Sequence, residues 1–138
     1  MKRYLIGIVC LVIVFSLSLI SGESDLESQK KIAIDYFVKL TGGDIEAADA
    51  LITIPYTLDL KKVLKTKEEV YGFHKKALES KGKRDIPEYT CELTKEAPKL
   101  DPNIFPPYTP FRVKIKGHGH LDIYVTNTKD PKVMGFTD

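Results

Sequence analysis

The chain has 138 residues, which is enough for one domain. It carries 21 basic and 19 acidic side chains, and removing residues 1–22 takes away Lys2 and Arg3 and leaves 19 charges of each sign. This balance does not favour a nucleic-acid partner. Cys91 is then the only cysteine, so an internal disulfide is excluded and stability has to come from the hydrophobic core.

The N-terminal segment predicts export of the rest of the chain. A positively charged start at Lys2-Arg3 is followed by an uncharged apolar run at residues 4–20 and by two small residues. This layout is typical of a cleavable signal peptide, here residues 1–22. Because the apolar run has 17 residues, the short edge of what spans a membrane, an uncleaved anchor is the alternative. In both cases the domain at 23–138 is exported to the periplasm, the envelope or the extracellular space.

Two helices are predicted at the start of this domain. Ser24 and Glu27 have the spacing of a capping box, in which each side chain hydrogen-bonds to the other's free backbone N–H group. An apolar stripe at helical spacing follows, and two consecutive glycines end the helix. The stripe consists of Ala33, Tyr36, Phe37 and Leu40. Asp44 caps a second, shorter helix, "IEAADALI".

A third helix is predicted after the short strand "YTLDL" and the segment "KKVLK". It begins at a second capping box, Thr66 and Glu69, and closes at Gly82. Its buried stripe consists of Val70, Phe73, Ala77 and Leu78, and His74 borders that stripe. Residues 61–84 carry nine basic and three acidic side chains. We interpret them as a solvated helix face, with a patch for an anionic surface as the alternative.

The hydrophobic period then changes from 3.6 to 2, which indicates strands. Tyr89, Cys91 and Leu93 alternate with polar residues and form one inward face. Residues 97–110 contain five prolines and are predicted to be a long loop, of a kind that is usually functional or mobile. The segment "KVMGF" near the C-terminus predicts a last strand.

The segment "FRVKIKGHGHLDIYV" at 111–125 predicts a hairpin with His118 at its tip. Odd positions are apolar or glycine and even positions are polar, so one face points inward. A three-residue loop preserves this parity, and we expect Ile115 to face Leu121. The residues expected on the outward face are Arg112, Lys114, His120, Asp122 and Tyr124.

Two histidines and an aspartate of this hairpin suggest a possible metal site. Successive side chains on the same face of a strand are about 7 Å apart, too far to share a small ion without bending. An outward face also lacks the groups that orient ligand histidines. We therefore interpret His118, His120 and Asp122 as part of a solvated hairpin, and we expect neither a metal nor a cofactor.

The order of these elements resembles the nuclear transport factor 2-like superfamily. The likeness rests on "AIDYFVKLTGGDIEAADALI", "TKEEVYGFHKKAL" and "FRVKI…LDIYV…KVMGF" and covers about 23–138. It implies an α+β fold in which a curved antiparallel sheet wraps around three helices as a cone. Helices followed by antiparallel strands already predict the α+β class. Members include ketosteroid isomerases, dehydratases, epoxide hydrolases and non-catalytic binding domains, so the fold does not determine the function.

Enzymes of this superfamily hold polar groups deep in the cone, where apolar walls shift their protonation. The inward candidates here for a ligand pocket are Tyr36, His74, Tyr89, Cys91 and Leu93. No Asp or Glu falls on a predicted inward strand position, so the carboxylates of the isomerases and hydrolases have no evident counterpart.

Three functional hypotheses follow. The leading one is an exported, non-catalytic domain that binds a small apolar ligand in the cone or a partner protein, such as a second copy, through the outward residues of the sheet. The second is a small lyase or isomerase with Tyr89 and His74 as its acid–base pair. The third is a structural domain that the basic segment 61–84 tethers to an anionic envelope surface.

Overall fold

The computed structural model describes residues 25–82 and 87–138, so the predicted signal peptide lies outside the described residues. The helices are α2 (Leu26–Thr41), α3 (Ile45–Asp49) and α4 (Lys67–Lys81), and the strands are β1 (Ile52–Leu58), β2 (Lys62–Leu64), β3 (Tyr89–Leu93), β4 (Tyr108–Ile115), β5 (Gly119–Thr126) and β6 (Val133–Thr137). Within these two ranges no helix combines the length and apolar character needed to cross a membrane.

Side-chain caps define where the two long helices begin. At α2 the Asp25 carboxylate accepts a hydrogen bond from the backbone N–H three residues on, at 2.7 Å, so the cap lies one residue after the predicted Ser24. At α4 the predicted cap is confirmed, since Thr66 Oγ1 accepts from Glu69 N at 3.2 Å. The Glu69 carboxylate reaches one residue further back than a standard box and accepts from Lys65 N at 2.8 Å.

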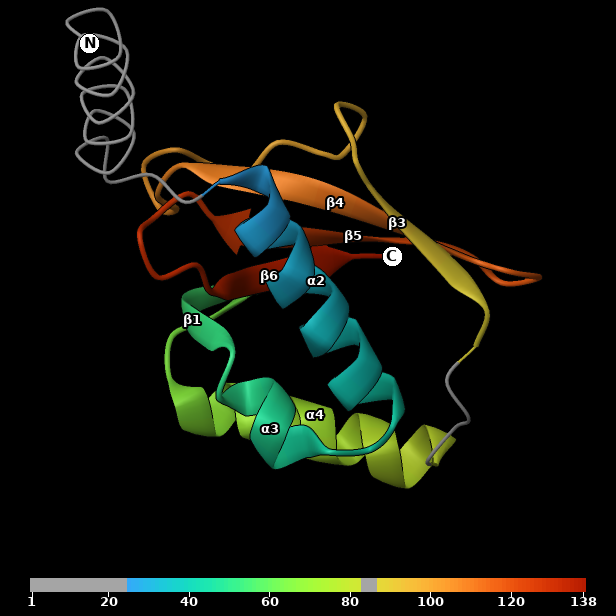
Figure 1. Ribbon diagram of the computed structural model, residues 1–138. Coiled ribbons are helices and arrows are strands. Elements are labelled where there is room, and N and C mark those ends of the chain that lie inside the picture. The colour runs from blue at the N-terminus through green and yellow to red at the C-terminus, as the bar shows by residue number, and fades with distance from the viewer. Residues whose placement is uncertain (1–24, 83–86) are drawn as a thin grey trace, which may run out of the picture.

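The six strands form one sheet in the order β2-β1-β6-β5-β4-β3. Neighbouring strands are antiparallel except β1 and β6, which run parallel, so the sheet is mixed rather than wholly antiparallel. Figure 1 shows the helices gathered on one side of the sheet, with α2 against β3 to β6 and α4 against β1 and β2. The predicted α+β class, with helices held by the inner face of one sheet, is confirmed.

The hairpin of β4 and β5 has the predicted parity but a different register. Ile115 pairs with Gly119 and not with Leu121, which pairs with Val113. The loop still has three residues, but it begins one residue earlier than predicted, and Gly117 takes its left-handed position with φ of 79°. The partner of Ile115 is shifted by two residues, and a shift by an even number keeps every side chain on the same face of the sheet. The odd-numbered side chains therefore still face the core, and His118 remains exposed at the tip.

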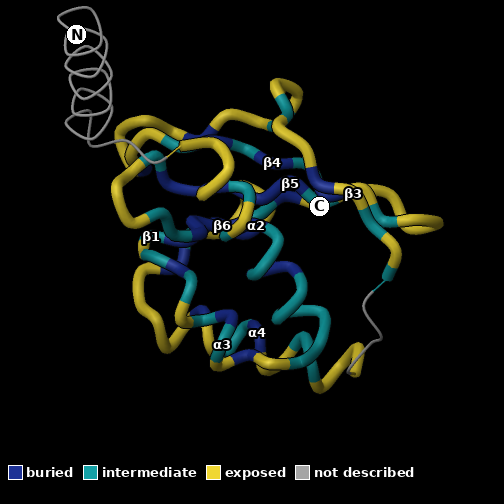
Figure 2. Tube along the Cα trace, in the orientation of Figure 1, coloured by how far each residue is buried: buried dark blue, intermediate teal, exposed yellow. Residues whose placement is uncertain are grey.

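The main hydrophobic core lies between the inner face of the sheet and the helices (Figure 2). Both predicted stripes contribute to it, through Ala33 and Phe37 of α2 and Val70 of α4. From the sheet come Cys91 and the inward residues of β4 and β5. The interior of the cone is thus packed with side chains from every layer.

A second, smaller core covers part of the outer face of the sheet. It consists of Leu100, Phe105, Tyr124 and Met134. The Tyr124 hydroxyl donates to the carbonyl oxygen of Pro98 at 2.8 Å, which ties the proline-rich loop to β5. The loop is also shorter than predicted, because β4 begins at Tyr108. Pro110 is tolerated in β4 because its carbonyl oxygen, which accepts from Thr94 N at 3.1 Å, faces the β3 side, and its nitrogen faces the same side, where the ladder with β3 has ended at Phe111.

Candidate functional site

A chain of four hydrogen-bonded polar side chains runs through the main core. Asp49 Oδ1 lies 2.6 Å from His74 Nδ1, and His74 Nε2 lies 2.9 Å from the Tyr36 hydroxyl. The Tyr36 hydroxyl in turn hydrogen-bonds to the hydroxyl of Tyr56. We call these four residues the core polar chain. It joins α2, α3, α4 and β1, and so it connects every described helix to the sheet.

Local sequence explains why these side chains point inward. Tyr36 belongs to the apolar stripe of α2, and His74 follows Val70 by one helical turn in α4. Asp49 lies four residues after the buried Ile45, on the same side of the short helix α3. Tyr56 is one of the residues of β1 that enter the core. The backbone therefore delivers all four groups to one place.

The hydrogen positions along the core polar chain are determined by a count of donors and acceptors. If His74 is neutral with its proton on Nδ1, that proton goes to Asp49, Tyr36 donates to Nε2, and Tyr56 donates to Tyr36. Every hydrogen then has an acceptor. If His74 is doubly protonated, Nε2 also donates, and one tyrosine hydrogen has no acceptor among the described residues. The neutral imidazole is therefore the form that the geometry favours.

Burial of His74 also favours the neutral imidazole. Removal from water lowers the pKa of His74 from its ordinary value of 6.5, and the hydrogen bond and negative charge of Asp49 oppose that shift without reversing it. Burial also raises the pKa of Tyr36 and of Tyr56. These directions favour the uncharged form of all three rings at neutral pH.

The core polar chain is closed to solvent except at Asp49. Tyr36 and Tyr56 are 0% exposed and His74 is 1% exposed, whereas the Asp49 side chain is 17% exposed. The surface hollows that we describe below have other linings. The arrangement can relay a proton between Asp49 and the core, but no substrate reaches the tyrosine hydroxyls in this conformation.

The other predicted pocket residues lie apart from this chain. Tyr89 is half-buried and packs edge-on against Phe37, with ring centroids 5.0 Å apart. Cys91 is buried, and burial raises the pKa of its thiol to about 11, so it is an inert core residue. Leu93 is 49% exposed on the edge strand β3. The structure thus brings Tyr36 and His74 together and leaves the remaining three elsewhere.

Sequence reasoning missed Asp49 and Tyr56. The expectation that a carboxylate has no counterpart considered strands only, whereas the carboxylate comes from a helix. The available signal for Asp49 was its i+4 relation to the apolar Ile45. Tyr56 had no comparable signal, since β1 follows no clear alternation of buried and exposed positions.

Outward residues of β4 and β5 take part in an ion-pair network. Arg112 binds Asp122 through two hydrogen bonds of 2.8 and 2.9 Å, because the two residues are directly opposite in the register. Arg112 also binds Glu96 at 2.8 Å. His120 is exposed and does not join this network. In residues 25–82 and 87–138 no three His, Cys, Asp or Glu side chains are placed to hold a metal ion.

Burial on this face differs from the expected outward exposure at two positions. Asp122 is 2% exposed and Tyr124 is 0% exposed, and the proline-rich loop packs on Tyr124. Lys114 and His120 are exposed as predicted, and Arg112 is half-buried. The open part of the outer face on β4 and β5 therefore lies on β4 and the start of β5, beside the edge strand β3.

Two of the hollows at the surface of the described residues are relevant to binding. The first, which we call the β3 hollow, has a volume of about 260 Å³. It is lined by Thr90, Glu92, Leu93, Thr94, Lys95, Glu96, Arg112 and Lys114. The second, which we call the Ile54 groove, has a volume of about 560 Å³ and lies between β1, β2 and the proline-rich loop. It is lined by Ile54, Pro55, Val63, Lys65, Asn103 and Ile104.

Similarity to known proteins is found among solved structures. No model of a known protein family matches the chain, and a search of curated proteins finds no match. Among solved structures, a nuclear transport factor 2-like protein of unknown function from Cytophaga hutchinsonii is similar to it. The two chains are 9% identical, the match covers 79% of this chain and 86% of that one, and the TM-score is 0.41. The similarity concerns the fold alone.

Proposed function

We propose that the protein is an exported, non-catalytic domain that acts through its surface and not through its interior. The observation that carries this proposal is the closure of the core polar chain, in which each hydrogen has an acceptor and three of the four residues are at most 1% exposed. Buried side chains of the described helices and strands occupy this part of the interior, which disfavours an apolar ligand there. The apolar N-terminal segment at 4–20 supports export.

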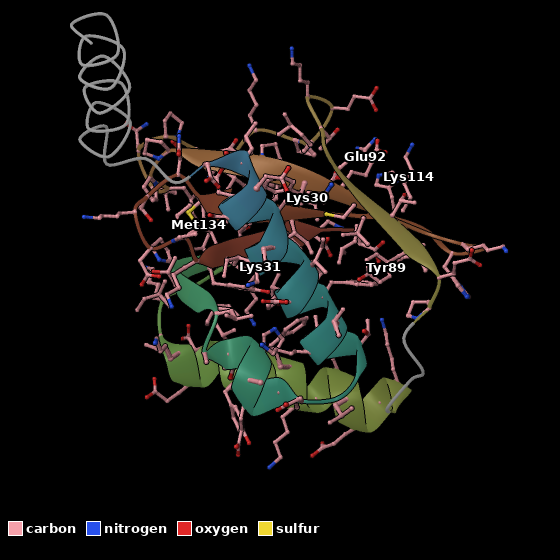
Figure 3. The ribbon with its side chains drawn as sticks, in the orientation of Figure 1. Lys30, Lys31, Tyr89, Glu92, Lys114 and Met134 are labelled. Carbon is pink, nitrogen blue, oxygen red and sulfur yellow. The ribbon has the colours of Figure 1, made fainter. Side chains whose placement is uncertain are left out.

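The surface that best fits a partner is the outer face of β3 and β4, which we call the β3–β4 strip. It presents Thr90, Glu92, Arg112 and Lys114 beside the β3 hollow. Glu92 and Lys114 are exposed, and neither takes part in an ion pair within the described ranges. Figure 3 labels both side chains at this side of the sheet, and both line the β3 hollow. The strip therefore offers one unpaired charge of each sign.

A second copy of the chain is the partner that this charge pattern fits. In a two-fold dimer, a residue of one copy contacts a different residue of the other copy, and the reverse contact forms by symmetry. A surface that carries both a positive and a negative charge is therefore complementary to itself. Glu92 of one copy pairs with Lys114 of the other, and the reverse pair forms by symmetry. The proline-rich loop covers the outer face over Tyr124 and leaves the strip open.

Charge reversal tests this dimer. We expect the purified full-length chain to sediment as a dimer in analytical ultracentrifugation. Glu92→Lys and Lys114→Glu each place like charges opposite one another and shift the species to a monomer. Mixing the two variants restores a dimer, because each supplies the charge that the other lacks.

Glu79→Lys is the matched control, since Glu79 is an exposed residue of α4, away from the strip. This variant is expected to remain dimeric. A monomeric wild-type chain contradicts the proposed dimer, and so does a mixture of the two strip variants that stays monomeric.

The catalytic alternative has one observation in its favour, namely that His74 contacts both a carboxylate and a tyrosine hydroxyl. For catalysis a substrate has to enter the core and contact this group. Nuclear magnetic resonance of the His74 ring tests this, with a small apolar carbonyl compound such as cyclohexanone added as the probe. Shifted ring signals support the alternative, and unchanged signals at saturating probe contradict it for this class of compound.

A further inference from the structure

The Ile54 groove exposes apolar side chains from two distant parts of the chain. Ile54 of β1 is 42% exposed, and Ile104 of the proline-rich loop is 48% exposed. Both line the same groove, which also contains Pro55 and Val63. Two large aliphatic side chains that share one concave surface are a typical feature of a binding site, whereas scattered single ones are not.

The floor of the groove is held by the second core. Val63 lines the groove and also packs against the cluster that contains Leu100 and Phe105. The loop that supplies Ile104 is fastened by a turn in which Phe105 N–H donates to the carbonyl oxygen of Asp101 at 2.9 Å. The groove is therefore formed before any ligand arrives. Its volume of about 560 Å³ lies within the range of about 300–1,000 Å³ that small-molecule sites occupy.

The polar residues of the groove favour an anion at one end. Among the described residues that line it, Lys65 is the only charged one, and none is acidic. Within the part of the chain that the structure describes, the Lys65 ammonium group forms no ion pair. A neighbouring hollow shares Val63 and is lined by Lys62, Lys76 and Glu69, so it adds a net charge of +1 beside the groove. The side chain of Asn103 supplies a hydrogen-bond donor within the groove itself.

We propose that the Ile54 groove binds a single-chain anionic amphiphile of the fatty-acid class. The alkyl chain lies along Ile54, Val63 and Ile104, and the carboxylate pairs with Lys65. The groove is open on one side, which suits a flexible chain lying on the surface. This site is separate from the β3–β4 strip and does not depend on dimer formation.

Binding of monomeric sodium laurate tests the proposal. Titration calorimetry with the full-length chain, below the micelle concentration, is expected to show saturable binding. Ile104→Asp, which places a negative charge where the alkyl chain lies, is expected to weaken binding at least about tenfold. Lys65→Glu is expected to weaken laurate binding by a similar factor. Dodecanol, which has the same chain and no charge, is expected to bind more weakly than laurate to the wild-type chain.

Two control variants separate the groove from general surface effects. Leu93→Asp changes an exposed apolar residue outside the groove, and Lys75→Glu reverses an exposed charge of α4 that does not line it. Both are expected to bind laurate as the wild type does. Urea unfolding of every variant confirms that the substituted surface residues leave the fold intact.

Three outcomes overturn the proposal. The first is the absence of saturable laurate binding by the wild-type chain. The second is binding that Ile104→Asp and Lys65→Glu leave unchanged. The third is association with phosphatidylglycerol vesicles without binding of monomeric laurate, which identifies the groove and its lysines as a membrane-surface patch and not as a site for one amphiphile.

Discussion

The imidazole of His74 is enclosed by Tyr36, Asp49 and Tyr56, which come from three other elements. A protonated His74 ring therefore cannot turn toward water, and its positive charge stays buried. In the unfolded chain the same ring takes up a proton near its ordinary pKa of 6.5, whereas the pKa of the folded form is lower. Between these two values the unfolded state holds more protons, so acid favours unfolding.

The variant His74→Phe tests this coupling. At pH 7.5 it leaves the Asp49 carboxylate and the Tyr36 hydroxyl without their partner, and we expect a loss of about 2–4 kcal/mol in the free energy of unfolding. As the pH falls below about 6.5, the wild type loses the contribution of the neutral imidazole. The difference between wild type and variant in urea unfolding is therefore expected to shrink toward pH 5.

Lys75→Ala, which changes the exposed neighbouring residue in α4, serves as the reference for helix effects. It is expected to follow the pH dependence of the wild type. A His74→Phe variant whose stability changes with pH in parallel with the wild type would show that His74 does not titrate differently in the folded state.

Among the secondary-structure elements, the parallel pair β1 and β6 depends on one glycine. Gly135 has φ of 138°, and a Cβ atom placed on it would lie 2.6 Å from Thr57 Cγ2 and closer still to the Thr57 carbonyl oxygen. The two strands approach so closely at this point that no side chain fits between them. The register of β6 against both β1 and β5 is interrupted in the same region.

We expect Gly135→Ala to lower the free energy of unfolding by about 3 kcal/mol or more, because it adds a steric clash to a strained backbone angle. Gly72→Ala is the matched substitution in α4, where no atom lies within 4 Å of the added Cβ. It is expected to raise stability by about 0.5–1 kcal/mol, since alanine favours the helix. Urea unfolding of both variants decides the matter, and a Gly135→Ala protein as stable as the wild type contradicts the close approach.

In the whole molecule, different parts of the chain cover the two faces of the sheet. Helices cover the inner face, and the proline-rich loop covers part of the outer face through Phe105, Tyr124 and Met134. A loop of this length is ordered only if its own side chains bury enough apolar area. Phe105, at 6% exposed, is the largest group that the loop itself contributes.

Phe105→Ala is expected to release the loop from the sheet while the main core persists. Trypsin should then cleave after the exposed Lys99 faster than in the wild type, and mass spectrometry identifies the cut. Ile104→Ala changes the neighbouring residue, which is 48% exposed, and is expected to leave the cleavage rate unchanged. Equal cleavage rates in Phe105→Ala and the wild type contradict the anchoring role of Phe105.

Features that depend on neighbours in the chain could be predicted. Thr66 as a helix start, the stripe through Tyr36 and the inward parity of Val113 and Ile123 all follow from spacing along the sequence, because helix and strand periods are properties of the local backbone. The α+β class follows from the order of these elements. Even the wrong register of the β4–β5 hairpin left its inward face correct, since an even shift preserves parity.

The contacts that these residues make with distant parts of the chain are determined only by the tertiary structure. Asp49 and His74 are separated by 25 positions, and no local pattern states that α3 and α4 place them 2.6 Å apart. The parallel pairing of β1 with β6 and the burial of Tyr124 under a distant loop likewise depend on how finished elements pack. Backbone periods act over a few residues, whereas these contacts join segments that only the packed core brings together.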